Sequence, residues 1–416
     1  MHWQDQPLNT TFQIKKNIAK LMNKNSLIIA LLVLLNSVSF AQKNVRKPMA
    51  QLISDEFKFA ADQYKFLAKG IPVGKTPQTY QNGKHVNYDI QWWCSGFYSG
   101  SLWYIYEQTK NESIKKEAED ALKVIEANQT FTGNHDLGFM MYCSFGNAYR
   151  LTGKPEYKAI IQRSAESLST RYHDNVKAIQ SWNKGKYWNY PVIIDNMMNL
   201  EMLNWATDNG GNKKFKEIAV IHSNTTLKNH FRPDFSSFHV IDYNPETGAV
   251  KRKATWQGAA DCSAWSRGQA WALYGYTMMY RFTKDENYLK QAKGIAHFIL
   301  NHPNLPADKI PFWDFDAQGV PFAKRDASAG AIMASALLEL AQFSADKEKT
   351  EFKSAAETMI YSLASNAYRA KLGENGGFLL MHSTGAYPLN SEIDVPLVYA
   401  DYYYLEALAR YKKWYL

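Results

Sequence analysis

Two aspartates, Asp136 and Asp195, each stand at the start of an apolar helical stretch, where a carboxylate suits acid–base chemistry. Paired carboxylates in one pocket can act as general acid and general base on a sugar. For either residue alone, an N-cap that accepts backbone N–H groups is the common alternative. An N-cap does not explain the adjacent His135, or Asn196 and Asn199 on an otherwise apolar helix. We therefore predict that both aspartates face one pocket.

The environment of such a pair can separate the roles of its two carboxyl groups. A helix amino terminus lowers the pKa of a carboxyl group, whereas burial and a second carboxylate raise it. Two carboxyl groups in slightly different surroundings can then divide into one acid and one base.

The densest polar and aromatic stretch of the chain is residues 256–271. Arg267, at a predicted helix start, can face a carboxylate through the two-pronged guanidinium group. Trp271, one turn later, is placed to stack on a sugar face. The alternative for Arg267 is a buried salt bridge with Asp261.

A repeating unit organises the chain between residues 45 and 416, where no Pro/Gly/Ser-rich linker occurs. The unit is a Gly- or Asp-containing loop, a helix rich in small and aromatic residues, a polar turn, and an amphipathic helix. Roughly 40 to 75 residues separate successive units, a period typical of helical-pair repeats. The six richer helices are predicted to start near residues 93–97, 135–138, 195–198, 267–271, 326–330 and 400–403.

These six helix pairs can form an open solenoid or a closed (α/α)6 barrel. The richer helices are nearly apolar all round, as an inner ring requires, and their polar residues gather at the amino-terminal ends. We predict an all-α closed toroid with one pocket where the inner helices start. A hairpin at residues 238–243, with a turn at 244–248, is expected over that pocket. The loop 382–391 either overhangs the pocket, where Ser383 can meet a sugar substituent, or is an ordinary turn.

Bulk composition excludes some functional classes. The 416 residues carry a formal net charge of +9 without a Lys/Arg run, which suits an anionic ligand but does not indicate nucleic acid. The ten His residues are scattered and show no metal-ligand spacing, so we predict no metal and no cofactor. Cys94, Cys143 and Cys262 make no disulfide framework, and we expect buried free thiols.

The amino terminus has the pattern of an export signal. A basic start at residues 22–25 leads into an apolar run at 26–40, with small residues at Ser39 and Ala41. We predict an upstream extension plus signal peptide over 1–41 and a single catalytic domain over 42–416. The mature protein is expected in the periplasm or secreted, with no membrane insertion after signal removal. The sequence assigns no oligomeric state.

Four segments together resemble the unsaturated glucuronyl hydrolases of glycoside hydrolase family 88. They are the Asp136 and Asp195 segments, the Gln257–Gly258 pair with residues 265–271, and residues 391–403. The resemblance extends from about Trp92 to Leu408. Cys262 and Trp256 depart from the family pattern, which often has Asp and His at these positions.

The resemblance implies an (α/α)6 barrel and an enzyme that hydrates the double bond of a 4,5-unsaturated uronic acid at the non-reducing end of lyase products. Asp195 would be the general acid and then the base, and Asp136 would hold ring hydroxyls. The sugar would be bound by Trp93, His135, His239, Gln257, Arg267 and Trp271.

The expected partners are unsaturated uronate-terminated oligosaccharides, which can carry sulfate. Two alternatives stay open: an unsaturated rhamnogalacturonyl hydrolase, and a non-catalytic helical glycan-binding protein.

Overall fold

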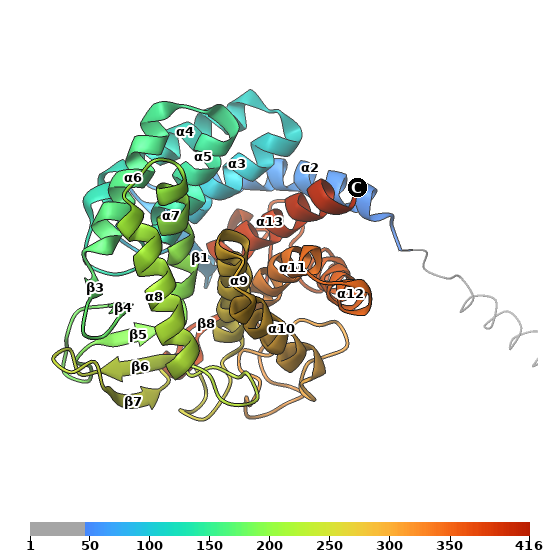
Figure 1. Cartoon of the computed structure of the whole chain (residues 1–416). Helices are drawn as coiled ribbons and strands as arrows, with labels where there is room; N and C mark the ends of the chain where they lie inside the picture. The colour runs from blue at the N-terminus through green and yellow to red at the C-terminus, as the bar shows by residue number, and fades with distance from the viewer. Residues whose placement is uncertain (1–45) are drawn as a thin grey trace, which may run out of the picture. The chain divides into compact units, whose positions relative to one another are not determined.

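The computed structural model describes residues 46–416, and residues 50–416 form one compact unit. Most of the unit is helical (Figure 1). Six helical segments are buried along most of their length and are called inner here. They are α3 (Phe97–Thr109), the π-helix η2 (Gly138–Gly146) continued by α5 (Asn147–Thr152), α7 (Asn196–Asp208), α9 (Ser266–Thr283), α11 (Ala327–Gln342) and α13 (Val398–Tyr415).

The other long helices bury only one face. In α4, for example, Ile114, Ala118, Leu122 and Ile125 recur at three- and four-residue spacing on the buried side. These outer helices are α2 (Met49–Ala68), α4 (Glu112–Ile125), α6 (Pro155–Ser169), α8 (Lys213–Asn229), α10 (Glu286–Asn301) and α12 (Asp346–Leu363).

Inner and outer helices alternate along the chain and pack as pairs. α3 contacts α4, η2 contacts α6, α7 contacts α8, α9 contacts α10, and α11 contacts α12. The Tyr404 hydroxyl of α13 donates to Glu56 of α2 at 3.1 Å, so the first and last helices of the unit also pack together. Each inner segment contacts the next one in chain order, and α13 also contacts α3.

Polar turn residues define where the outer helices begin. Asn111, Asn212 and Asp285 accept the backbone N–H two residues ahead, at 2.9–3.0 Å, and so cap α4, α8 and α10. These are the polar turns of the repeating unit.

Short strands fill the loops between helix pairs. β5 (Pro191–Ile193), β6 (Val240–Tyr243) and β7 (Val250–Ala254) form an antiparallel sheet in which Ile193 pairs with Val240. Because β5 ends just before Asp195 and β6 begins just after His239, this pairing brings the two side chains together. The predicted hairpin is confirmed as β6–β7. The remaining strands are β1 (Thr76–Gln81), β2 (Lys84–Tyr88), β3 (Tyr172–His173), β4 (Ala178–Ile179), β8 (Ser383–Ala386) and β9 (Ser391–Val395).

The helical fold and all six predicted inner-helix starts are confirmed to within a few residues. One difference is the wider π-helical winding over Gly138–Gly146. The cysteines are free, but Cys262 is exposed, so its predicted burial was wrong. None of the helices within residues 46–416 is long and apolar enough to cross a membrane. The predicted signal peptide and the domain boundary at residue 42 lie outside the described residues.

Candidate active site

A cavity of about 230 Å³ lies where α7, α9 and the π-helix begin. Its wall includes six of the nine side chains that the sequence singled out: Trp93, His135, Asp136, Asp195, Gln257 and Arg267. These residues are spread over more than 170 positions of the chain. The fold therefore gathers both aspartates into one pocket, as predicted.

Asp195 occupies the N-cap position of α7, yet its carboxylate makes no capping hydrogen bond. The N-cap alternative therefore does not account for this residue. Its Oδ2 atom is buried and has no hydrogen-bond partner among residues 46–416. Burial raises the pKa of the carboxyl group to about 7, although the Arg267 charge, the residue's own backbone N–H and Trp271 act in the opposite direction. Near neutral pH, Asp195 can thus both give and take a proton.

His239 lies next to this free oxygen, and its tautomer follows from its hydrogen bonds. The Nδ1 atom accepts the backbone N–H groups of Trp256 and Gln257 at 3.1 and 3.2 Å. Burial lowers the pKa of the ring well below its usual value, so the imidazole is neutral. The single proton then sits on Nε2, which lies 3.6 Å from Oδ2 of Asp195. His239 accordingly presents an N–H group to the carboxylate.

Asp136 is the second carboxyl group of the cavity. Its pKa is raised by burial and by the neighbouring Asp195. Nε2 of His135 lies 3.3 Å from Oδ1 of Asp136, and burial lowers the pKa of His135 to about 3, so this ring is also neutral. The backbone N–H of Asp136 donates to Asn134 at 2.9 Å, which fixes the start of this turn.

Arg267 is almost fully buried and joins the α9 start to the β8–β9 hairpin. Its Nη1 and Nη2 atoms donate to the carbonyl groups of Thr384 and Gly385, both at 2.5 Å. Nη1 also pairs with Asp326 at 3.0 Å. The predicted alternative partner, Asp261, was wrong because it pairs with Arg252 at 3.2 Å on the surface. Sequence reasoning missed Asp326, although its place at the start of α11 was noted as a helix start.

Gln257 completes this connection, since its Nε2 donates to the Gly385 carbonyl at 3.1 Å. The 382–391 loop, which forms most of the β8–β9 hairpin, is therefore held against the cavity by Gln257 and Arg267. Ser383, however, is fully buried and its hydroxyl has no partner within the described chain. The prediction that its hydroxyl reaches a sugar substituent does not fit this buried placement.

Trp93 and Trp271 were both predicted to contact the sugar, and the structure separates them. Trp93 is half-buried on the cavity wall, where it packs on Tyr399 with ring centroids 4.8 Å apart. Trp271 has no exposed surface and packs on Phe139 and Tyr403 at 5.1 and 5.3 Å. Trp271 therefore lies beneath the site, and the prediction that its ring stacks on a sugar was wrong.

The cavity also has residues that sequence reasoning did not assign. Trp92 is 39% exposed on the cavity wall, and its Nε1 donates to Gln78 at 3.1 Å. Gln78 in turn donates to Glu392 at 2.8 Å, and Tyr88 stacks on Trp92 at 4.6 Å. The adjacent Trp92–Trp93 pair was the only available signal, because the partners of Trp92 lie far apart in the sequence.

The arrangement is suited to protonating a substrate. It combines a carboxyl group that titrates near neutral pH, a second carboxyl group, and two neutral imidazoles. Such a set can donate a proton to carbon and then activate water from the same side.

Comparison with known proteins assigns the family. The model of Glycosyl Hydrolase Family 88 matches residues 72–414. The chain belongs to this family. An unsaturated glucuronyl hydrolase of Formosa agariphila is 43% identical over 385 residues, covering 91% of this chain and 95% of the relative. An unsaturated chondroitin disaccharide hydrolase of Streptococcus agalactiae is 34% identical over 349 residues, 82% of this chain and 86% of the relative.

The solved structures agree. The crystal structure of an unsaturated glucuronyl hydrolase specific for heparin superposes with a TM-score of 0.85 at 45% identity, covering 87% of this chain and 97% of that one. The enzyme from Bacillus sp. GL1 gives 0.81 at 29% identity, with 88% and 97% covered. These findings confirm a family 88 hydrolase of the unsaturated glucuronyl type, over the two predicted alternatives.

Proposed function

We propose that the chain removes the 4,5-unsaturated uronic acid from the non-reducing end of lyase-generated glycosaminoglycan oligosaccharides. The observation that carries this proposal is Asp195, a carboxyl group on the cavity wall with a pKa of about 7 and an oxygen that has no hydrogen-bond partner within residues 46–416. Relatives support the substrate class: one structure is of an enzyme specific for heparin, and an Asp-to-Asn variant of the Streptococcus agalactiae enzyme was crystallised with dGlcA-GalNAc6S.

In the proposed reaction, Asp195 donates its proton to carbon 4 of the double bond. Positive charge then develops at carbon 5 and the ring oxygen, next to Asp136, whose carboxylate form stabilises it. Water adds to carbon 5 and returns a proton to Asp195. The resulting hemiketal opens and releases the neighbouring sugar, so the enzyme regains its starting protonation state.

Hydration can be distinguished from ordinary glycoside hydrolysis by labelling. In D2O, proton donation by Asp195 places deuterium on one face of carbon 4, whereas attack at the anomeric carbon releases an unsaturated uronate whose enol takes up deuterium from solution on both faces. We expect NMR spectroscopy of the early product to find deuterium on a single face, together with loss of the ultraviolet absorbance of the substrate. The test uses disaccharides from heparin and from chondroitin 6-sulfate. Full turnover with deuterium on both faces of carbon 4 from the start would refute the mechanism, and no turnover of either disaccharide would refute the substrate class.

We also propose that the six helix pairs close into an (α/α)6 barrel. The contacts support closure, because each inner segment touches the next and α13 touches α3. A crystal structure in which α13 and α3 are separated would contradict this proposal.

We further propose that the chain is exported after removal of residues 1–41. The basic start at 22–25 and the apolar run at 26–40 support this proposal. Amino-terminal sequencing of the protein from its native host should begin at Gln42.

A further inference from the structure

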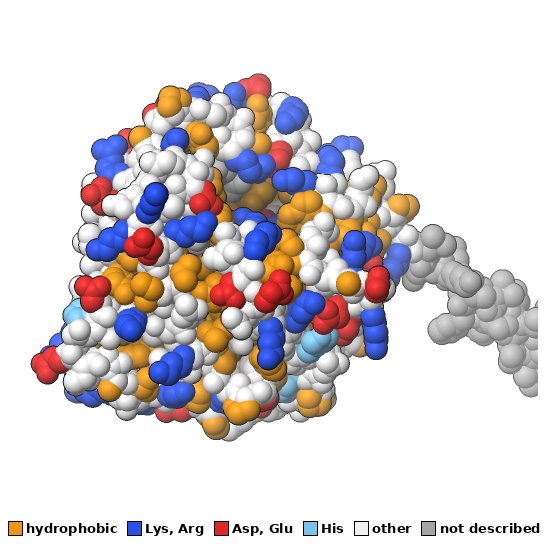
Figure 2. Space-filling model, viewed as in Figure 1, with side chains coloured by type: hydrophobic (Ala, Val, Ile, Leu, Met, Phe, Trp, Pro, Cys, Tyr) orange, Lys and Arg blue, Asp and Glu red, His pale blue; other side chains and the backbone are white. Residues whose placement is uncertain are grey.

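The unit has a second, larger cavity, of about 600 Å³, formed mainly by the middle and carboxyl-terminal parts of the inner helices. Its volume is within the range of small-molecule sites, about 300–1,000 Å³. Figure 2 shows the molecule hollowed between α7 and α13, with Lys and Arg side chains around the opening. No residue that the family resemblance assigned lines this cavity.

One wall of the second cavity is aromatic. Trp205 of α7 lies between Tyr142 of the π-helix and Tyr149 of α5, with ring centroids 5.9 and 5.3 Å away. All three side chains are partly exposed. Within residues 46–416, neither tyrosine hydroxyl nor the indole N–H has a hydrogen-bond partner, although each is a polar group that a ligand can use.

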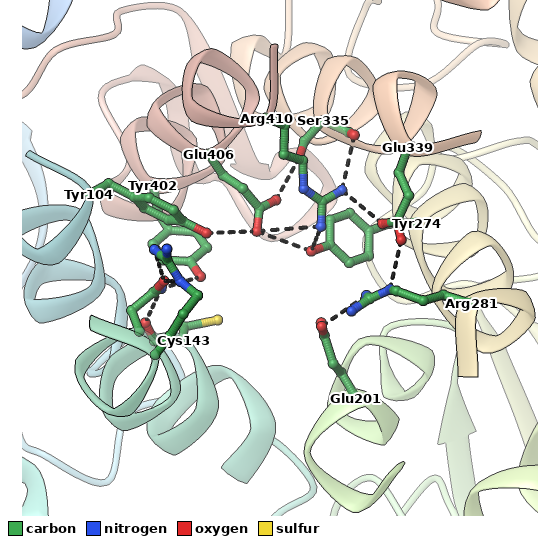
Figure 3. Close-up of polar contacts among 12 residues, drawn as sticks. Tyr104, Cys143, Glu201, Tyr274, Arg281, Ser335, Glu339, Tyr402, Glu406 and Arg410 are labelled. Atoms are coloured by element: carbon green, nitrogen blue, oxygen red, sulfur yellow. Dashed lines mark hydrogen bonds and ion pairs between the residues drawn. The ribbon is translucent and has the colours of Figure 1, made fainter. Parts of the chain in front are cut away.

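The other wall is a chain of alternating charges, drawn in Figure 3. Arg281 pairs with Glu201 at 2.9 Å and with Glu339 at 2.7 Å. Arg410 pairs with Glu339 at 3.1 Å and lies 3.7 Å from Glu406. Arg281 and Arg410 both have carboxylate partners, so they offer fixed, planar hydrogen-bonding groups, and Lys412 and Lys413 add positive charge to the cavity lining.

A held polar wall next to partly exposed aromatic rings is the combination that a sugar ring needs, and Glu201 and Trp205, one turn apart on α7, join the two. The aromatic faces cover the C–H side of a pyranose, and the planar carboxylate and guanidinium groups meet its hydroxyls, which both donate and accept. An apolar ligand would leave the carboxylates without solvent.

We propose that this second cavity binds a pyranose sugar. The proposal does not depend on the reaction assigned to Asp195. The same segments carry both sites, because Gly138 and Met198 on the cavity wall follow Asp136 and Asp195 within one turn. A sugar in the second cavity would therefore contact the two segments that begin at the two aspartates.

Calorimetric titration with N-acetyl-D-glucosamine, N-acetyl-D-galactosamine and D-glucose tests the proposal. We expect saturable binding of at least one of these sugars to the full-length protein. Trp205→Ala should weaken it at least tenfold, whereas Trp92→Ala, which removes an indole from the other cavity, should leave it unchanged. Hydrolysis at an unchanged rate by Trp205→Ala shows that this variant is folded.

A milder variant covers the case in which Trp205→Ala does not fold. Tyr149→Phe removes only a hydroxyl and should weaken sugar binding severalfold. Absence of saturable binding by all three sugars would overturn the proposal. So would binding that is lost in Trp92→Ala and kept in Trp205→Ala, because the sugar would then occupy the active-site cavity.

Discussion

Asp195 and Asp401 are buried aspartates near the starts of two inner helices, α7 and α13, and burial raises the pKa of both to about 7. Their surroundings differ. The carboxylate of Asp401 accepts the backbone N–H groups of Leu379 and Leu380 at 2.8 and 2.9 Å. Oδ2 of Asp195 has no hydrogen-bond partner in the described part of the chain, and the residue lies on the wall of a cavity.

The comparison separates a structural aspartate from a reactive one. A raised pKa alone does not distinguish them, because burial produces it in both places. A buried polar atom without a partner is destabilising. Asp195 combines such an atom with a place on the cavity wall, and this combination, more than its pKa, marks the catalytic position.

The largest expected effect comes from Asp195→Asn. The amide keeps the shape of the side chain but has no proton to donate, so kcat should fall by roughly a thousandfold or more. Folding and substrate binding should persist, because the lost oxygen had no partner. The rate is measured by ultraviolet absorbance, binding by calorimetry, and stability by thermal unfolding.

Asp401→Asn is the matched control for that variant. It makes the same chemical change in a buried aspartate of another inner helix, and its kcat should stay within a few-fold of the parent. A thousandfold loss in Asp401→Asn as well would show that the Asp195 effect reflects general disruption of the inner helices.

The pH dependence of kcat/KM sharpens the same comparison. Asp195 must be protonated to donate, so kcat/KM should decline as pH rises through about 7, approaching tenfold per pH unit at higher pH. Asp401→Asn should leave this alkaline limb in place. If the decline of kcat/KM shifts to another pH in Asp401→Asn, the titration belongs to Asp401 and not to Asp195.

For the free energy of unfolding we expect the reverse order, with a larger effect of Asp401→Asn than of Asp195→Asn. Asp401→Asn places an amide NH2 group or a single oxygen against two N–H donors, at a cost of about 1–3 kcal/mol in the free energy of unfolding. The raised pKa of Asp401 means that the folded state binds its proton more tightly than the unfolded state does. Its contribution therefore favours folding at low pH and is lost as pH rises from about 4 to about 7.

Chemical denaturation at pH 5 and pH 8 measures both effects. The parent protein should lose stability between these values, and Asp401→Asn should lose less. An equal loss in parent and variant would mean that Asp401 does not contribute to the pH dependence.

The sequence predicted the helical repeat well because its signals are local. Polar turn residues such as Asn111 and Asp285 and the apolar inner helices each act within a few residues. The π-helical winding after Leu137 has no such local signal. It occurs where the backbone packs closely against α7, since a Cβ added at Gly138 would lie 2.5 Å from Asn199.

The site was predicted in part for the same reason. Asp136, Asp195 and Arg267 are visible because polar residues at apolar helix starts are unusual. The sequence does not show how deeply a side chain is buried, and for this reason the predicted sugar contacts of Trp271 and Ser383 were wrong. Asp326, the partner of Arg267, becomes identifiable only once α9 and α11 lie side by side.

The smallest expected effect is that of Trp92→Ala, which tests whether Trp92 contacts the leaving saccharide and not the reacting uronate. Trp92 lies on the cavity wall, apart from the Asp195–His239 contact, and its indole is fixed through Gln78 and Glu392. Trp92→Ala should raise KM severalfold and leave kcat nearly unchanged, because it removes packing area and not a proton donor. Gln78→Leu, which only frees the indole, should produce a smaller rise.

Steady-state kinetics with a disaccharide and a tetrasaccharide from the same lyase digest measures this effect. If Trp92 contacts the leaving saccharide, the rise in KM will be larger for the tetrasaccharide, which covers more of the cavity mouth. A fall in kcat with unchanged KM would instead place Trp92 with the reacting groups. Trp92 would then act in proton transfer and not only in sugar binding.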